Sequence, residues 1–459
     1  MKIKRILSVL LICLLTISLF QSVIASAEDE FGQTADGWKY EKSGDGYAWI
    51  INYVGNEEKV TIPQVVDGRK VVVVEIVNTD LKEIIVPDNA EFHWFTFNDC
   101  TGLEKVYVGT GTKEIVERAF NGCTSLKTVE LPNTLEKIKT SAFSNCSSLE
   151  NIEITSSVKQ LDSGAFSGTN LKNITLPENL KTVGSSVFEG CKKLENVVFL
   201  SNEIDYIYNP EYDSEIFRNT LPYYFFKDCV SLKSIKIPES VEVICGSAFE
   251  NCISLTSFTI PKKVKTINYR TFKGCEKLET INVPSQVTKI DQGAFEDCVS
   301  LKFIDLPESV NKICESAFAY SGLTSITIPK NVKTIYKNAF KGCENLTSVK
   351  FAGAVNNIGK SAFSKCVNLK TVNFTKGYLK KVYDYAFYKC EKLDKITISN
   401  TKNVPTIAKS AFNKAKSGIK FYVKNNTVAK KLKSKLQKTN IKKAKIYRSA
   451  PILIYKNIG

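Results

Sequence analysis

A phenylalanine that returns about every 23 residues is the feature that most limits what this chain can fold into. Between Phe97 and Phe412 the chain restarts thirteen times on the pattern A-F-x-x-C-x-x-L-x-x-I-x-I-P-x-x-V-x-x-I, and every interval but one is 22 to 25 residues long. A repeat of this length is the sequence signature of a solenoid, in which each repeat forms one coil. The anchoring residues are Phe97, Phe120, Phe143, Phe166, Phe188, Phe226, Phe249, Phe272, Phe295, Phe318, Phe340, Phe363, Phe387 and Phe412.

Each repeat has one apolar side that it cannot bury alone. Stacking covers that side with the neighbouring coil, so the core becomes a continuous column. The Ile-x-Ile or Ile-x-Leu pair has the period of a short strand, and the proline that follows ends the strand because it has no N–H to donate. The sequence therefore predicts a β-rich solenoid of short strands and turns. In the repeat that starts at Phe272, the apolar positions are Cys275, Leu278, Ile281, Val283, Val287, Ile290 and Ala294.

The first 27 residues have the features of a secretory signal peptide. Three basic residues at positions 2, 4 and 5 precede an apolar run, 6–20, and an Ala-Ser-Ala cleavage sequence ends at Ala27. A lipoprotein signal would use Cys13, but a bulky residue precedes it and it lies in the middle of the apolar run. No second run approaches the roughly 20 apolar residues that a membrane helix needs. We expect the mature chain to be exported, and either released or held at the cell surface by non-covalent contacts.

Residues 28–96 lack the full repeat and are predicted to form an N-terminal β-rich cap. Aromatic residues and one isoleucine alternate there with smaller or polar residues, as they do in strands. The segment Val60-Thr61-Ile62-Pro63 already resembles the strand end of a coil. The cap is therefore expected to lead into the solenoid, which spans residues 97–412. The alternating residues are Trp38, Tyr40, Tyr47, Trp49, Ile51 and Tyr53.

Residues 413–459 form a strongly basic end. The whole chain has a net charge of +16, yet this segment alone holds thirteen lysines and Arg448 without one acidic residue, so the body of the chain is nearly neutral. An irregular last coil, 419–423, precedes a helical spacing of apolar residues over 426–436 and a strand-like stretch, 444–447. We predict a small α/β cap.

Two interpretations of this basic end stay open. A solenoid needs a polar outer face where stacking stops, and lysines supply one. The same lysines would also hold the protein on an anionic surface such as a wall polymer or lipid headgroups. No nucleic-acid-binding motif accompanies the charge, so nucleic acid is not an expected partner. The candidate contacts are Lys430, Lys431, Lys433, Lys435, Lys438, Lys442 and Lys443.

Eleven of the fourteen cysteines occupy one repeat position, three residues after the phenylalanine. Cysteine packs as a small buried hydrophobe, and repeats that lack it place Leu171 or Leu323 in the next apolar slot. We therefore expect a ladder of buried thiols, with disulfides between adjacent coils as the alternative. Cys245 and Cys314 lie instead four residues before a phenylalanine, three coils apart. The 23-residue spacing does not fit a zinc site.

Candidate catalytic groups are scarce. His93 is the single histidine, so every histidine-dependent triad, base or metal cluster would have to use it. The acidic residues are scattered over polar repeat positions, whereas glycoside hydrolysis needs two carboxyl groups facing each other across a cleft. There is no phosphate-binding glycine loop. The sequence indicates a protein that is not an enzyme and needs no cofactor or metal.

The interval from Phe188 to Phe226 is 38 residues long and is the main departure from the repeat. We place its insertion at about 200–224, where aromatic residues lie beside several acidic ones. Insertions in repeat proteins map to loops and often to the binding face, and tyrosine offers a large rigid surface with a polar tip. Alternatively the loop folds back over its own coil. The candidate partner-binding residues are Tyr206, Tyr208, Tyr212, Phe217, Tyr223 and Tyr224.

The repeats resemble those of the BspA-type leucine-rich-repeat proteins of bacteria and some protists. The resemblance is clear in the unit that starts at Ser316-Ala317-Phe318 and in the sequence Cys298-Val299-Ser300-Leu301. The resemblance covers nearly the whole mature chain. It implies a surface or secreted protein with a solenoid of short strands, and some members are implicated in attachment to host matrix proteins, in attachment to other bacteria or in host immune recognition. It supplies neither a ligand nor catalytic residues.

Two functions follow as hypotheses. The first is a secreted adhesin that binds an extracellular protein or glycan through the solenoid face and the aromatic insertion. The second is a structural, wall-associated protein held by its basic end. An enzyme is a distant third, since neither cap looks like a catalytic domain.

Overall fold

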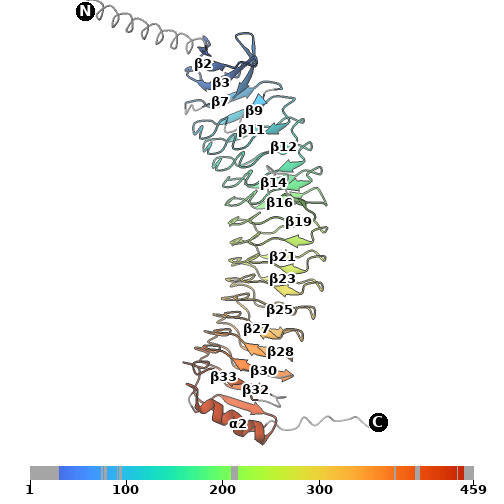
Figure 1. Ribbon diagram of the computed structural model, residues 1–459, viewed down its shortest axis with the longest axis vertical. Coiled ribbons are helices and arrows are strands. Elements are labelled where there is room, and N and C mark those ends of the chain that lie inside the picture. The colour runs from blue at the N-terminus through green and yellow to red at the C-terminus, as the bar shows by residue number, and fades with distance from the viewer. Residues whose placement is uncertain are drawn as a thin grey trace, which may run out of the picture. The chain divides into compact units, whose positions relative to one another are not determined.

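The computed structural model describes residues 30–73, 76, 80–89, 91–92, 96–207, 216–376, 379–398, 404–441 and 443–448. The predicted signal peptide lies outside these residues. The chain divides into two units, Met1–Asn170 and Leu171–Gly459. Figure 1 shows short strands repeated along each unit, one coil after another. The predicted β-rich solenoid is confirmed.

The first unit begins with a mixed sheet of six strands in the order β1-β2-β3-β6-β5, with β8 beside β6. Its core contains Trp38, fully buried against Tyr53 with ring centroids 4.7 Å apart. In β3 the buried residues are Ala48 and Ile50, whereas Trp49 is exposed. The predicted N-terminal strands thus form, but the large aromatic residue of β3 faces outward. The bounds are β1 Phe31–Gln33, β2 Trp38–Lys42, β3 Tyr47–Tyr53, β5 Val65–Val66, β6 Arg69–Val73 and β8 Glu91–Phe92.

Coil stacking in this unit starts before the first anchoring phenylalanine. Parallel pairing runs from Lys59 to Glu83 and on to Lys105, so the segment that ends in Ile62-Pro63 is already a coil strand. A second set of two-residue strands follows at the Val-x-x-Ile end of each repeat, where the sequence alone indicated no strand. The bounds are β4 Lys59–Thr61, β7 Glu83–Val86, β9 Lys105–Val108 and β11 Thr128–Glu130, then β10 Glu114–Ile115, β12 Lys137–Ile138 and β13 Gln160–Leu161.

The second unit carries the same two kinds of strand. The longer ones, before the prolines, form what we call the long-strand face, and their inward residues are apolar while the outward ones are polar. Strands are missing at this position in two described coils, 234–237 and 302–306. The bounds are β14 Asn173–Leu176, β16 Asn196–Phe199, β21 Ser257–Thr259, β23 Thr280–Asn282, β26 Ser325–Ile328, β28 Ser348–Ala354, β30 Thr371–Lys376, β32 Lys395–Ile398, β34 Lys420–Val423 and β35 Lys445–Arg448.

The shorter strands of this unit pair in parallel, apart from Ile216–Phe217, which runs antiparallel to its neighbour. In most of them the first residue is the more exposed one and the second is buried. We call this set of strands the short-strand ladder. The bounds are β15 Thr182–Val183, β17 Asp205–Ile207, β18 Ile216–Phe217, β19 Thr220–Leu221, β20 Val243–Ile244, β22 Thr266–Ile267, β24 Lys289–Ile290, β25 Lys312–Ile313, β27 Thr334–Ile335, β29 Asn357–Ile358, β31 Lys381–Val382 and β33 Thr406–Ile407.

The anchoring phenylalanines stack face to face inside the coils. In the first unit their ring centroids are 5.1 to 5.5 Å apart from Phe97 to Phe166. In the second unit the spacing from Phe188 to Phe412 is 5.2 to 5.7 Å. This separation is slightly larger than the distance between hydrogen-bonded strands, about 4.8 Å. One ring per coil therefore fills the core at the repeat of the backbone.

A residue in the left-handed backbone conformation lies two positions before the phenylalanine and another lies two positions after it, and together they form the turn that holds the ring. Ser141 and Asn145 have φ values of 54° and 61° around Phe143, and Gly293 and Asp297 have values of 65° and 62° around Phe295. Glycine adopts this region freely, and asparagine and aspartate tolerate it better than most residues. The turn geometry explains why small or polar residues recur two positions before and after the ring.

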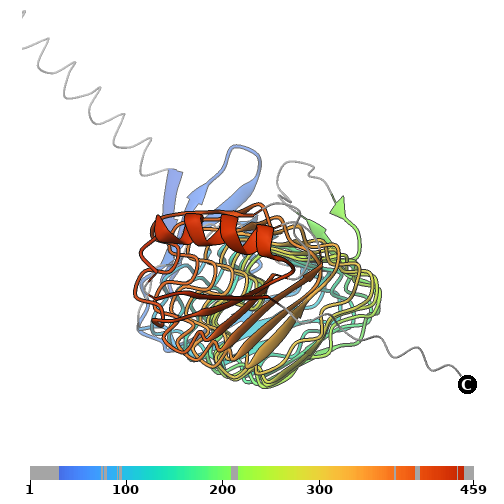
Figure 2. The same ribbon diagram turned by 90° about the horizontal axis from the view of Figure 1, so that it is seen from below.

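The C-terminal cap has the predicted elements. Helix α2, Asn426–Gln437, buries Val428, Leu432 and Leu436, and Figure 2 shows it lying across the last coil. Asn425 caps its N-terminus by accepting a hydrogen bond from the backbone N–H of Val428 at 2.9 Å. The last long-strand pair, β34 and β35, is parallel. Among the described residues, no helix is both long and apolar enough to cross a membrane.

Candidate functional site: aromatic and basic surfaces

The insertion adds one strand tier to the short-strand ladder. β17 pairs with β15 in the ordinary register, Thr182 opposite Asp205. The chain then turns back in the antiparallel strand β18, with Phe217 opposite Tyr206, before β19 enters the ladder and pairs with β20. The hairpin of β17 and β18 extends outward from the coils (Figure 2).

The extra strand tier does not interrupt the column of stacked phenylalanine rings. Phe188 stacks directly on Phe226, with centroids 5.7 Å apart and rings 7° from parallel. The Cys229 thiol likewise donates to the carbonyl of Phe188 at 3.1 Å, the contact found in regular coils. The inserted residues are therefore placed outside the core. Of the candidate residues, Tyr208 and Tyr212 lie outside the described part of the chain.

The four described aromatic candidates form one cluster. Tyr206 is buried, its hydroxyl lies 2.9 Å from the hydroxyl of Ser185, and its ring stacks on Phe217 at 5.7 Å. Tyr223 packs edge-on against Tyr206 at 6.3 Å and lies the same distance from Tyr224. Tyr206 thus supports the cluster and has no free ring face. Phe217, Tyr223 and Tyr224 are 42%, 44% and 40% exposed, and we call these three residues the aromatic surface.

The aromatic surface continues onto the next coils through a residue that sequence reasoning missed. A Cβ atom at Gly246 would lie 3.0 Å from the Tyr269 carbonyl oxygen and 3.5 Å from both a Tyr223 ring carbon and the Tyr269 Cβ atom, so the backbone of Gly246 lies between the two tyrosines. Tyr269 is exposed, and the Arg270 guanidinium lies 4.8 Å from its ring centroid. The signal was a tyrosine three residues before Phe272, the position that Tyr223 holds before Phe226.

A lysine next to the aromatic surface is held in place. The Lys227 ammonium lies 5.5 Å from the Tyr224 ring centroid and 2.7 Å from the Glu189 carboxylate. The hydrogen bond to Glu189 raises the pKa of Lys227, although burial opposes the shift. The cluster therefore combines apolar rings, hydroxyl groups and a fixed positive charge.

The lysines of the basic end differ in their exposure and in their contacts. Lys430, Lys431, Lys433, Lys438 and Lys443 are exposed. Lys435 is half-buried and donates to the carbonyl of Val404 at 3.0 Å, so it helps to dock α2. Lys442 lies outside the described residues. No carboxylate of the described residues pairs with the five exposed lysines, and the charged side chains of α2 are all positive.

All thirteen described cysteines are buried free thiols. In the regular coils the thiol donates to the carbonyl of the phenylalanine one coil earlier, as Cys275 does to Phe249 at 3.2 Å. Burial raises the pKa of Cys245 to about 12 and that of Cys314 to about 11. Reactive cysteines have a lowered pKa, so the thiols of Cys245 and Cys314 act as packing groups.

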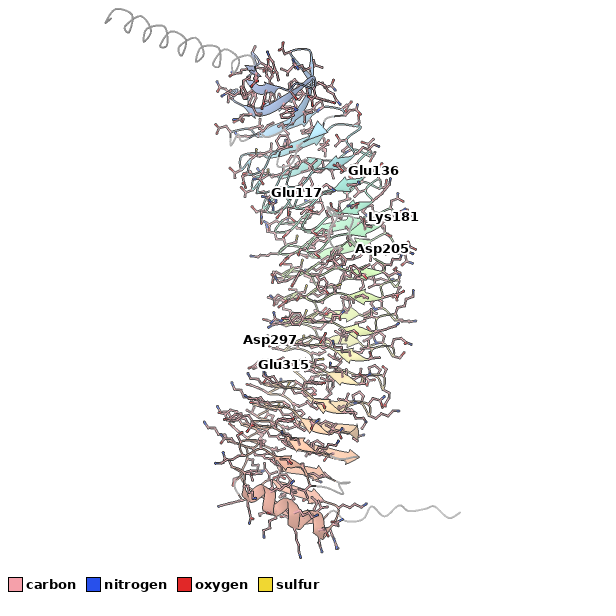
Figure 3. The ribbon with its side chains drawn as sticks, viewed as in Figure 1. Glu117, Glu136, Lys181, Asp205, Asp297 and Glu315 are labelled. Carbon is pink, nitrogen blue, oxygen red and sulfur yellow. The ribbon has the colours of Figure 1, made fainter. Side chains whose placement is uncertain are left out.

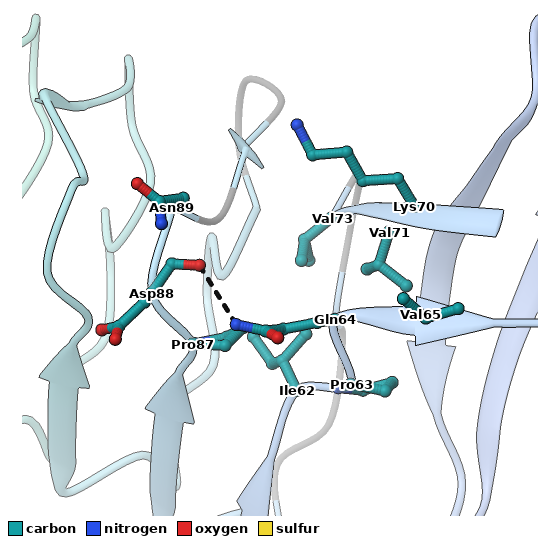
Figure 4. A pocket seen from close by; sticks show the side chains of 10 residues that line it. All are labelled: Ile62, Pro63, Gln64, Val65, Lys70, Val71, Val73, Pro87, Asp88 and Asn89. Carbon is teal, nitrogen blue, oxygen red and sulfur yellow. Dashed lines mark hydrogen bonds between the residues drawn. The ribbon is translucent and has the colours of Figure 1, made fainter. Parts of the chain in front are cut away.

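The pocket shown in Figure 4 lies in the first unit, between the end of β4 and the β5–β6 hairpin. Its volume is about 300 Å³ and its walls are mostly apolar, with Lys70 and Asp88 among the lining residues. Gln64 donates to the carbonyl of Asp88 at 3.3 Å across one side. The size is at the lower end for a small-molecule site, and no reactive side chain converges on it.

No catalytic arrangement is found among the described residues. Asp205, Asp297 and Glu315 come from three different coils of the second unit (Figure 3). No group of three histidine, cysteine, aspartate or glutamate side chains is placed to hold a metal within this part of the chain. His93 lies outside it. The leucine-rich-repeat solenoid is typically a non-catalytic fold.

The comparisons with known proteins agree with this architecture. The model of the BspA type leucine-rich repeat region matches six copies over residues 78–215, 219–347 and 333–454. No curated protein matches the chain.

A leucine-rich repeat protein from Bacteroides ovatus has a similar crystal structure, with a TM-score of 0.71 at 22% identity over 91% of this chain and 99% of that one. A leucine rich cell surface protein from Faecalibacterium prausnitzii aligns at 24% identity over 74% of this chain and 94% of that one, with a TM-score of 0.43 that supports no further argument. The structural likeness shows the fold, and the family model covers most of the chain. The protein therefore belongs to the BspA-type leucine-rich-repeat family.

Proposed function

We propose that this protein is an exported, non-catalytic binding protein that attaches to an extracellular protein or glycan, as an adhesin does, through the aromatic surface. The observation that carries the proposal is the cluster of Phe217, Tyr223 and Tyr224, each at least 40% exposed and supported from below by buried Tyr206. Aromatic residues are enriched at protein interfaces, and tyrosine is among the residues that most often contribute a large share of the binding energy. Leucine-rich-repeat proteins bind proteins in general, and the signal-like sequence over 1–27 supports export.

The test compares two triple variants. Phe217→Ala, Tyr223→Ala and Tyr224→Ala together remove the aromatic surface, whereas the control removes three exposed tyrosines elsewhere in the same unit. Residues 28–459 are tested for binding to matrix proteins, glycans and purified wall fragments at low and physiological salt. A loss of saturable binding in the first variant alone supports the proposal. Equal loss in both, or none in either, contradicts it. The control residues are Tyr336, Tyr383 and Tyr385, which are 40%, 37% and 39% exposed.

Deleting Glu203–Phe217 gives a second variant with an intact core. The deletion removes fifteen residues and leaves a 23-residue coil in which β19 takes the ladder position of β17. β19 already pairs with β20 in the ordinary register, Thr220 opposite Val243. Circular dichroism should therefore be unchanged while partner binding weakens. Unchanged binding would mean that the hairpin only covers its own coil.

A second function is favoured by the basic end. We propose that it holds the protein on an anionic wall polymer, because the five exposed lysines on and after α2 have no carboxylate partner among the described residues. Exposed charges are screened by salt. Retention on wall fragments should fall sharply between low and high salt, and salt-independent retention would count against this function.

A further inference from the structure

Three lysines that the predicted anionic contacts did not include lie directly opposite one another on the long-strand face. Lys395, Lys420 and Lys445 are in register on the parallel strands β32, β34 and β35. Upstream, the same register position on β26, β28 and β30 holds Ser325, Ser348 and Thr371. Because parallel strands lie about 4.8 Å apart, the column presents one ammonium group roughly every 5 Å.

This column costs stability on its own. Like charges directly opposite each other on neighbouring strands are destabilising. Their one acidic partner among the described residues is Asp394, whose carboxylate lies 3.3 Å from Lys420 and 2.7 Å from Lys416. These two lysines lower the pKa of Asp394, so it stays ionised and is already shared between them. Neither Lys395 nor Lys445 has an ion-pair partner among the described residues.

Two tyrosines run parallel to the lysines, two residues further along their strands. Tyr422 and Tyr447 stack with ring centroids 5.3 Å apart and ring planes 20° apart. The Lys395 ammonium lies 4.7 Å from the Tyr422 ring centroid. Tyr422 is thus held between Lys395 and Tyr447, and it is half-buried whereas Tyr447 is exposed.

The ring arrangement decides between two kinds of anionic polymer. Proteins that bind single-stranded nucleic acid stack successive bases on a series of open aromatic faces. Tyr422 is covered on both faces by Lys395 and Tyr447, so the two rings do not form such a series. Hydroxyl groups beside a row of ammonium groups match the hydroxyls and repeated charges of a sugar chain. We call Lys395, Lys420, Lys445, Tyr422 and Tyr447 the lysine–tyrosine stripe.

We propose that the lysine–tyrosine stripe binds a linear acidic polysaccharide lying across the last three long strands. The charges of the two partners are complementary, and the spacing of the lysines is close to the length of one sugar unit in an extended chain. The inference deepens the second function proposed above and rests on it. It assigns the contact to the sheet face, whereas the sequence pointed to the helix.

The experiment compares two variants with the same loss of charge. The stripe variant carries Lys395→Ser, Lys420→Ser and Lys445→Ser, since serine occupies this register position on β26 and β28. The control carries Lys262→Ser, Lys265→Ser and Lys277→Ser, three exposed lysines elsewhere in the same unit that neither proposed contact includes. Binding of residues 28–459 to polygalacturonate and to heparin is measured by calorimetry at physiological salt, with dextran and single-stranded DNA as further probes.

We expect the stripe variant to lose about tenfold or more in affinity for the acidic polysaccharides, a change of about 1.4 kcal/mol. The control should retain most of its affinity, and dextran should not bind. Removing the like charges should leave the melting temperature of the stripe variant unchanged or higher, which separates lost binding from misfolding. A Tyr447→Ala variant should also bind more weakly.

Three results would overturn the inference. Equal losses in the stripe variant and the control would mean that net charge alone attracts the polymer. Binding of single-stranded DNA as tight as that of the polysaccharides would mean that the stripe does not recognise sugars. Absence of polysaccharide binding, with salt-sensitive retention on wall fragments preserved, would refute the stripe and leave the second proposed function standing.

Discussion

Replacing Phe295 by alanine tests whether the phenylalanine column stabilises the coils locally. The ring is fully buried and stacks on Phe272 at 5.6 Å and on Phe318 at 5.3 Å. A buried Phe→Ala substitution costs about 3–5 kcal/mol, of which the two lost ring contacts account for about 1–3 kcal/mol. A repeat contacts only its neighbours, so the damage should stay within about one coil on either side.

Hydrogen exchange measures this prediction coil by coil. The backbone N–H groups of Phe272 and Phe295 donate to the carbonyls of Ala294 and Ala317 at 3.0 and 2.8 Å. Their protection should fall by a factor of about a hundred to several thousand, as the free-energy loss implies. The N–H of Phe387, which donates to Ala411 at 2.8 Å in the same unit, should keep its protection.

Phe303→Ala is the matched control, because it makes the same substitution at an exposed position of the coil that starts at Phe295. Phe303 is 67% exposed, and surface substitutions usually change stability by no more than about 0.5 kcal/mol. If Phe303→Ala destabilised the protein as much as Phe295→Ala, or if protection at Phe387 fell together with that at Phe295, the reasoning from local ring stacking would be refuted.

Three further predictions concern buried groups. Burial raises the pKa of Asp162, although Gln160 and Lys139 lower it, so the ionised carboxylate destabilises the folded state once the pH exceeds the ordinary pKa of aspartate. In urea unfolding, Asp162→Asn should therefore stabilise the first unit at pH 7 and not at pH 3. An equal effect at both pH values would contradict this. The thirteen buried thiols should resist iodoacetamide at pH 8 until the protein unfolds, as mass spectrometry would show; rapid labelling of Cys245 or Cys314 in the folded protein would refute their role as packing groups. A Cβ atom at Gly322 would lie 2.1 Å from the Val299 carbonyl oxygen, whereas one at Gly44 would meet nothing within 4 Å; Gly322→Ala should therefore lower the melting temperature and Gly44→Ala should not.

The local sequence was enough to predict the coils because every repeat has nearly the same pattern of apolar residues. The apolar positions, the buried thiols and the helix and strand of the C-terminal cap follow from periodicity and are present in the structure. The strands before the prolines follow from it too, but those expected before Pro238 and Pro307 are missing. The short-strand ladder was not predicted, since two residues give too little alternation to mark a strand. The outward position of Trp49 was also not predicted, because the inner face of β3 is set by the strands that pair with it.

Only the tertiary structure decided which surface groups lie together. The sequence singled out the insertion and the lysines of α2, but it could not show that Tyr206 is buried, that Gly246 lies between Tyr223 and Tyr269, or that Lys395, Lys420 and Lys445 share one register. Residues about 25 positions apart become neighbours only when coils stack, and the register of that stacking is set by backbone hydrogen bonds. The local sequence thus determines the fold of each coil, whereas the binding surfaces depend on how neighbouring coils stack.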